Sequence, residues 1–360
     1  MDSNVRYRLA PQMIEYDRLG QVWRPYLMHF HPPHYRSATV STDGFGLRYT
    51  DDGARRYTAT EGRDGTAASV VIGGSAMFGV GVTADSRTVP SILAAEEKST
   101  WLNLGGRAFS GSQELMLFQA LVSRIGPVRR VAIVSGLNDL VLPAVTSSWD
   151  PVLGACYFQS QFERGMATAG LSPKRRWAQA LLGPVVGGRV DFARASWGEM
   201  SRALRHSLLT PRSGAGASEA VPSIDPDQVV ERAISQIRKN LTVWLILSKG
   251  MGFDLIYFLQ PTAQWTNHAS SAEEAAIFDF LEQAQGPTDW DIFNLLSRDV
   301  YLAYAETLRA LCEELGVRLV DLNPTFPAGE CDGRWLFVDR GGHFTDEGSA
   351  AVATRMLEII

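Results

Sequence analysis

The feature that most constrains the fold is a short, mostly apolar segment that ends in two glycines and a serine. Residues 67–72 are rich in alanine and β-branched side chains, and they run directly into Gly73, Gly74 and Ser75. Such a run predicts a buried strand. Two glycines let the chain turn where a side chain would clash. The segment therefore predicts that Ser75 lies at the carboxyl end of a strand, the edge of an open α/β sheet where ligands bind.

From residue 67 onward, strand and helix patterns alternate along the chain. The strands are expected over residues 67–72, 100–104, 128–135, 254–259 and 317–322, and the helices over residues 90–97, 113–125, 225–250, 297–315 and 344–360. Alternation at this spacing is typical of a parallel sheet with helices on both faces. We therefore predict a three-layer α/β/α domain with a parallel sheet of about five strands.

Two regions do not follow this alternation. Residues 1–66 are rich in aromatic and turn-forming residues, and short strands at 37–41 and 46–50 predict a β-rich N-terminal extension. Residues 146–225 hold amphipathic pieces and a segment of small residues, which predicts a helical and flexible insertion. We expect the main domain to span residues 67–360, with this insertion as a candidate lid or dimer surface.

Composition excludes several classes of protein. The chain has 360 residues and a net charge of −5, so no nucleic-acid-binding face is expected. No apolar run reaches 18 residues, the length that would suggest a membrane span, and the first residues contain no apolar core of a secretory signal. Cys156, Cys312 and Cys331 lie far apart, which favours reduced thiols and a cytoplasmic location.

A histidine-rich segment in the N-terminal extension suggests one alternative function. His29, His31 and His34 lie within six residues, and imidazole nitrogens are good ligands for Zn²⁺. The intervening Pro32 and Pro33 favour an extended backbone, and no carboxylate lies at helical spacing to complete a site. We expect a surface loop here and no bound metal, and we keep a metal-dependent hydrolase as the alternative.

Residues suited to nucleophilic catalysis follow several of the predicted strands. Ser75 follows the first strand, a glycine-rich segment at 103–110 follows the second, Asn138 follows the third, and His343 lies near the C-terminus. A serine nucleophile needs a base such as a neutral histidine, and hydrogen-bond donors directed at the developing oxyanion. An acidic group can hold the imidazole in the required tautomer. Together these segments predict a serine-hydrolase site.

These segments, in this order, resemble the SGNH (GDSL-type) hydrolase family over about 67–145 and 250–360. Residues 73–79 resemble its first block, with glycine in place of the name-giving aspartate, residues 136–139 match its Gly-x-Asn-Asp block, and residues 343–348 match its last block. The resemblance implies a flavodoxin-like fold and an ester hydrolase that needs no metal or organic cofactor. It also implies that Ser75 is the nucleophile and His343 the base.

Two positions depart from the family pattern. The glycine that usually donates its N–H to the oxyanion is Ala108 here, and because alanine keeps the N–H we expect Ala108 to be the donor, with Gly106 as the alternative. The acid usually lies three residues before the histidine, but that position is Arg340 and Asp339 lies four before. We expect Asp339 to orient His343; otherwise the site is a Ser–His dyad in which a backbone carbonyl orients the ring.

The resulting expectation is hydrolysis of an acyl ester or thioester of an intracellular small molecule through an acyl-enzyme on Ser75. The N–H groups of Ser75 and Ala108 and the amide of Asn138 would hold the oxyanion. Arg107 and Gln260 are predicted to contact the substrate. Two further alternatives stay open, an acyltransferase that uses the same acyl-enzyme and a catalytically silent binding protein, and so does assembly into a homodimer.

Overall fold

The computed structural model describes residues 5–146, 149–169, 225–284 and 295–360. The chain divides into two compact units, one formed by Met1–Tyr157 with Ile224–Ile360 and the other by Phe158–Ser223. The described part of the second unit is the helix α7 (Gln159–Ala169). The amphipathic pieces predicted within residues 146–225 lie outside the described residues, so the insertion's helical character and its role as a lid stay predictions.

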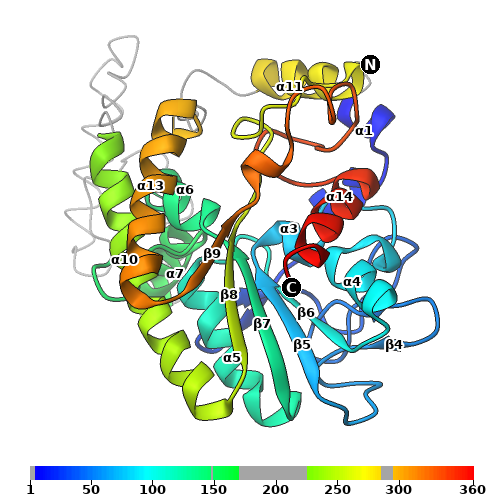
Figure 1. Cartoon of the computed structure of the whole chain (residues 1–360), viewed down its shortest axis with the longest axis vertical. Helices are drawn as coiled ribbons and strands as arrows, with labels where there is room; N and C mark the ends of the chain where they lie inside the picture. Colours follow the sequence, from blue (N-terminus) through cyan, green and yellow to red (C-terminus); the bar gives the residue numbers. More distant parts are fainter. Residues whose placement is uncertain (1–4, 147–148, 170–224, 285–294) are drawn as a thin grey trace, which may run out of the picture. The chain divides into compact units, whose positions relative to one another are not determined.

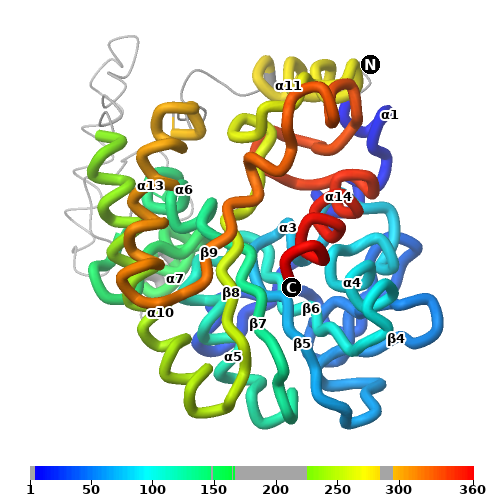
Figure 2. Tube along the Cα trace, viewed as in Figure 1, coloured from blue at the N-terminus to red at the C-terminus, as the bar shows by residue number. Residues whose placement is uncertain are grey.

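The first unit is built on one parallel sheet of five strands, which confirms the predicted fold class. Its strands are β5 (Ala68–Gly73), β6 (Trp101–Gly105), β7 (Val128–Ser135), β8 (Asp254–Leu259) and β9 (Arg318–Asp321). Their order is β6-β5-β7-β8-β9, and every neighbouring pair is parallel, as the adjacent arrows and tubes in Figures 1 and 2 show. The order reverses between β5 and β7, and in such sheets ligands bind at the carboxyl ends beside that point.

Helices cover both faces of the sheet (Figure 1). One face carries α5 (Gly111–Ile125), α10 (Pro226–Met251) and α13 (Arg298–Leu315), and the other carries α4 (Val89–Glu97) and α14 (Asp346–Leu357). The local signals explain the ends of α10. The Asp225 side chain accepts a hydrogen bond from the N–H of Asp227, Pro226 is the first helical residue, and Gly252 closes the helix at φ +75°.

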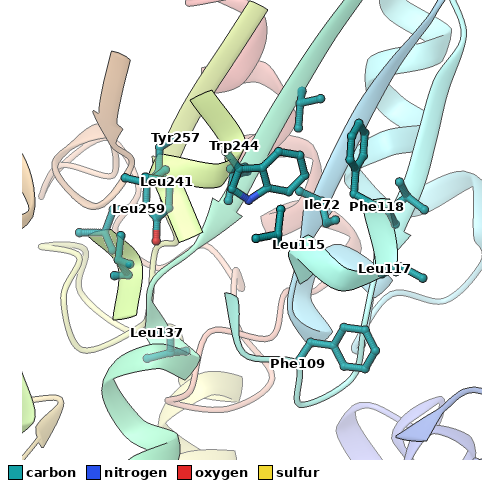
Figure 3. Close-up of a cluster of buried hydrophobic side chains, with 14 of the residues drawn as sticks. Ile72, Phe109, Leu115, Leu117, Phe118, Leu137, Leu241, Trp244, Tyr257 and Leu259 are labelled. Carbon is teal, nitrogen blue, oxygen red and sulfur yellow. The ribbon is translucent and has the colours of Figure 1, made fainter. Parts of the chain in front are cut away.

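The larger hydrophobic cluster lies between the sheet and α5 and α10. Figure 3 shows Ile72 of β5, Leu115 and Phe118 of α5, Trp244 of α10 and Tyr257 of β8 within this cluster, and all five side chains are at least 90% buried. The opposite cluster contains Val71, Trp101 and Phe258 with apolar residues of α4 and α14. Burial on both faces explains why the central residues of these strands are mostly apolar.

Other short elements connect the strands and helices. They are α3 (Ser75–Phe78), α6 (Leu137–Val145), α11 (Ala272–Ala284), and the 3₁₀ turns at Asp85–Arg87 and Asn323–Thr325. None of the described helices is both long and apolar enough to cross a membrane.

The N-terminal region differs from the β-rich extension expected for residues 1–66. It begins with two helices, α1 (Val5–Leu9) and α2 (Met13–Arg18), and its strands form two small antiparallel pairs. These pairs are β1 (Val22–Arg24) with β2 (Met28–Phe30), and β3 (Thr50–Asp51) with β4 (Arg56–Tyr57). The strands expected at 37–41 and 46–50 are reduced to bends, the single bridges Arg36 with Ser41 and Thr42 with Arg48, and Thr50, the first residue of β3. This segment contains a buried arginine.

That arginine, Arg48, is only 1% exposed and joins the N-terminal region to the main domain. Its guanidinium pairs with Asp85 at 2.9 Å and donates to the carbonyls of Phe78 and Gly79 at 3.0 and 2.9 Å. Burial of an arginine is tolerated when its charge is paired and its N–H groups have acceptors. The N-terminal region is therefore packed against the end of α3, the helix that begins with Ser75.

Candidate active site

Ser75 lies where the sequence places it, at the carboxyl end of β5 and at the start of α3. A Cβ atom on Gly74 would lie 2.7 Å from the Nδ2 atom of Asn138, and one on Gly73 would lie 2.2 Å from the carbonyl oxygen of Val134. Both contacts are shorter than packed atoms allow. The two glycines are therefore required for the close approach of this turn to the end of β7 and to Asn138.

Three side chains from distant segments meet at this edge. The Ser75 Oγ lies 2.6 Å from Nε2 of His343, and Nδ1 of His343 lies 2.5 Å from Oδ2 of Asp339. Asp339 is ionised at neutral pH, so Nδ1 carries the ring proton and donates it to the carboxylate. Nε2 is then the acceptor for the Ser75 hydroxyl. This tautomer is the one a general base for serine requires.

The loop that carries the acid and the base brings Asp339 to the ring despite its spacing of four residues. Gly342 adopts φ +87°, and the Val338 N–H donates to the His343 carbonyl at 2.9 Å. Burial alone would raise the pKa of the Asp339 carboxyl, but the charge and hydrogen bonds of His343 outweigh it and hold that pKa below its usual value. Arg340, at the usual acid position, pairs with Glu282 at 2.5 Å.

The segments that follow β6 and β7 lie against the Gly73–Gly74 turn and carry hydrogen-bond donors. The Asn138 Nδ2 donates one hydrogen to the carbonyl of Phe109 at 2.7 Å, which leaves its second hydrogen for another acceptor. Ala108 adopts the left-handed conformation, φ +56°, as expected of a position that is usually glycine. Within the described part of the chain, the N–H groups of Ser75 and Ala108 have no protein acceptor.

The alternative donor Gly106 is differently placed. Its N–H donates to the carbonyl of Gly73 at 2.9 Å, which extends the pairing of β5 with β6. This N–H is therefore already engaged, and Ala108 is the donor that the loop offers.

The two residues predicted to contact the substrate are directed at the protein. The guanidinium of Arg107 donates to the carbonyl of Leu19 at 2.8 Å. Gln260 is 5% exposed, and its Nε2 donates to the carbonyl of Gly342 at 3.3 Å. This buried amide contacts the His343 loop, and the predicted substrate contacts of Arg107 and Gln260 stay predictions.

The three histidines of the N-terminal region do not gather around one point. The Nε2 atom of His29 donates to the carbonyl of Arg107 at 2.9 Å, and Nε2 of His31 accepts from the N–H of Arg107 at 3.1 Å. His34 is exposed. No group of three or more histidine, cysteine or acidic side chains suited to a metal ion occurs among the described residues. The Nε2 atoms of His29 and His31 are bound to the backbone of Arg107, beside Ala108.

A buried acidic pair lies beneath the site. It is formed by Asp139, the last residue of the 136–139 block, and Glu114, to which no sequence pattern assigns a role. Asp139 accepts from the N–H of Gly111 at 3.0 Å, and Glu114 accepts from the Ser135 hydroxyl at 2.9 Å. Burial raises the pKa of Asp139 to about 6, and burial together with the charge of Asp139 raises the pKa of Glu114 well above its usual value. Asp139 therefore anchors the first turn of α5, directly after the loop that contains Ala108.

Comparisons with known proteins give structural matches alone. No family model matches the chain, and no curated protein matches its sequence. A member of the lipolytic protein G-D-S-L family from Veillonella parvula is 14% identical, with a TM-score of 0.41, over 82% of this chain and 98% of that one. An acetyl xylan esterase is 12% identical (TM-score 0.36; 81% and 100% covered), and an extracellular lipase from Streptomyces rimosus is 15% identical (TM-score 0.35; 81% and 99% covered).

Proposed function

We propose that this chain is a serine ester hydrolase of the SGNH type. The observation that carries the proposal is the pair of contacts from the Ser75 hydroxyl to His343 at 2.6 Å and from His343 to Asp339 at 2.5 Å. The serine and histidine lie 268 residues apart in the chain, and they meet at the carboxyl edge of the sheet beside unengaged N–H groups. A nucleophile, a base and an orienting acid in this geometry are the requirements for acyl transfer to serine.

The first half of the reaction forms the acyl-enzyme. The Ser75 Oγ attacks the acyl carbonyl carbon while His343 Nε2 accepts the hydroxyl proton, and Asp339 stabilises the resulting imidazolium. The N–H groups of Ser75 and Ala108 and the amide of Asn138 hold the oxygen that becomes negatively charged. The bond from carbon to the leaving oxygen or sulfur then breaks, and the leaving group takes the proton from Nε2.

The second half releases the acyl group. Water attacks the Ser75 ester, gives a proton to His343, and adds its oxygen to the acyl carbon. The bond to Oγ breaks, Oγ takes the proton back, and a carboxylic acid leaves. An alcohol or amine in place of water would make the same steps an acyl transfer. This alternative stays a prediction, as do the small-molecule acyl ester or thioester substrate, the cytoplasmic location and the homodimer.

Labelling of Ser75 tests the proposal. We expect a fluorophosphonate to add one equivalent to the protein, mass spectrometry to place the adduct on Ser75, and Ser75→Ala to abolish both the adduct and p-nitrophenyl acetate hydrolysis. Incubation with a panel of acyl esters and thioesters would then identify the acyl group from the mass added. No adduct and no turnover of any activated ester would leave a binding protein as the better account.

A further inference from the structure

The peptide groups on both sides of Arg107 are bound by histidines from the N-terminal region. We propose that His29 and His31 are positioning residues that direct the N–H of Ala108 toward the reacting carbonyl oxygen. The inference rests on the proposed function, because it assigns a role in the oxyanion site. It makes the N-terminal region a part of the catalytic apparatus, where sequence patterns indicate only a surface loop.

His29 acts on the peptide group that contains the Ala108 N–H. Its Nε2–H donates to the Arg107 carbonyl at 2.9 Å, and its ring packs edge-on against Phe109 with the centroids 5.4 Å apart. In a trans peptide the C=O of one residue and the N–H of the next point in opposite directions. A hydrogen bond on the Arg107 carbonyl therefore sets the direction of the Ala108 N–H. It also polarises that N–H and makes it a better donor.

His31 acts on the preceding peptide group. Its Nε2 accepts from the Arg107 N–H at 3.1 Å, and its Nδ1–H donates to the Gly46 carbonyl at 3.1 Å, so both bonds require the neutral ring with the proton on Nδ1. The ring is 1% exposed and lies on Phe78 of α3, with the centroids 3.8 Å apart. His31 therefore joins the helix that begins with Ser75 to the loop that contains Ala108.

The conformation of Ala108 explains why such support is needed. Its φ of +56° is unfavourable for a residue with a Cβ atom, and such a residue keeps this conformation only when its surroundings impose it. Without the two histidines, rotation of the flanking peptide groups would relieve this strain and turn the N–H away from the reacting oxygen.

The charges around His31 are compatible with this role. Burial, the guanidiniums of Arg107 and Arg48, and the neighbouring His29 lower the pKa of His31 well below its usual value, although the Gly46 carbonyl opposes them. Burial also lowers the pKa of His29, in spite of its bond to the Arg107 carbonyl. Both rings stay neutral at neutral pH, which keeps Nε2 of His31 an acceptor.

Paired variants test the inference by steady-state hydrolysis of p-nitrophenyl acetate. His29→Leu and His31→Leu replace each ring with an apolar side chain of similar size that cannot form the hydrogen bonds. We expect kcat to fall about 10- to 100-fold while KM stays within about twofold of the wild-type value. His29→Gln and His31→Gln retain an amide that can replace each bond, and we expect them to recover most of kcat. His34→Asn, in the same segment but exposed and at φ +55°, is the matched control and should equal the wild type.

The outcomes separate this inference from the proposed function. A folded His29→Leu and a folded His31→Leu with wild-type kcat, in a protein that hydrolyses the ester, would overturn the inference alone. A wild-type protein with no turnover and no Ser75 adduct would overturn both. Melting temperatures identify folded variants, and Met at either position is the replacement if Leu prevents folding. Equal loss of kcat in the Leu and Gln variants would assign the histidines a packing role and contradict the inference.

Discussion

The two loops on either side of Ser75 are held in contrasting ways. The orientation of His343 depends on contacts within its own loop, because Asp339 lies four residues from His343 and the Val338 N–H donates to the His343 carbonyl. The loop with Ala108 is held by His29 and His31, which lie 78 and 76 residues from Arg107 in the chain. His343 is therefore oriented by a residue of its own loop, whereas the Ala108 loop is held by two histidines of the N-terminal region, in which the sequence shows no catalytic motif.

This contrast predicts how strongly substitutions in each loop should lower kcat. Changes within the His343 loop remove a reacting group or its immediate partner, so their effects should be large and confined to proton transfer. Changes on the Ala108 side remove one of several donors or a support behind a donor, so their effects should be smaller and graded.

The largest effect is expected from loss of the base. His343→Ala removes the only acceptor within hydrogen-bond distance of the Ser75 hydroxyl among the described residues, and we expect kcat for p-nitrophenyl acetate to fall by about 10⁴-fold or more. The melting temperature should change little, since the ring is partly exposed. A rate within tenfold of the wild type would show that another group takes the proton.

Next is the acid. Asp339→Asn keeps the shape of the side chain but removes the charge and lets the His343 ring take the wrong tautomer, and we expect kcat to fall about 10²- to 10⁴-fold. Asp339→Ala serves as the control that removes both charge and shape. If both variants keep wild-type kcat, the site works as a Ser–His dyad, and the local support of this loop has no catalytic consequence.

On the other side of Ser75, Asn138→Ala removes one oxyanion donor and its bond to the Phe109 carbonyl. We expect kcat for p-nitrophenyl acetate to fall about 10²- to 10³-fold. Asn138→Ala and His29→Leu act on different donors of one site, so a double mutant should reveal non-additive effects. An unchanged kcat in Asn138→Ala would remove Asn138 from the oxyanion site.

The smallest effect on the chemistry, and a clear effect on stability, is expected from Asp139→Asn. The folded carboxyl has a pKa of about 6, above its usual value of 3.8, so between these pH values the folded state binds more protons than the unfolded state. Its contribution to the free energy of unfolding therefore falls as pH rises from about 4 to 6, by about 3 kcal/mol at most. Asparagine can still accept from the Gly111 N–H.

Denaturant unfolding of both proteins at pH 4 and pH 8 measures this difference. We expect Asp139→Asn to gain stability relative to the wild type on going from pH 4 to pH 8. An equal difference at both pH values would mean that Asp139 does not titrate in this range. Activity close to that of the wild type would show that the charge beneath the site is not part of the chemistry.

Local sequence patterns were sufficient to predict most strands and helices of the main domain. The strands at 128–135 and 254–259 have the bounds that the sequence predicts, since the buried part of each parallel strand, 131–134 and 256–259, is an apolar run. The missed helices α1 and α2 are short and carry no strong cap. α11 has one, because the Ser271 hydroxyl accepts from the Glu274 N–H and the Glu274 carboxylate accepts from the Ser271 N–H, a capping box that was overlooked in the sequence. The contact of Gln260 with the His343 loop could not be predicted, because it depends on which loop covers this side chain.

The sequence by itself determined the sheet, the order of its strand ends, and the residues that the first, third and last motifs bring to them. Tertiary structure alone decided that Asp339 reaches His343 across four residues, that the Gly106 N–H is engaged by Gly73, and that two histidines bind the backbone beside Ala108. The physical reason is the distance along the chain over which each kind of interaction acts. Strand and helix patterns depend on neighbours a few residues away, whereas the direction of a single N–H depends on side chains that only packing brings together.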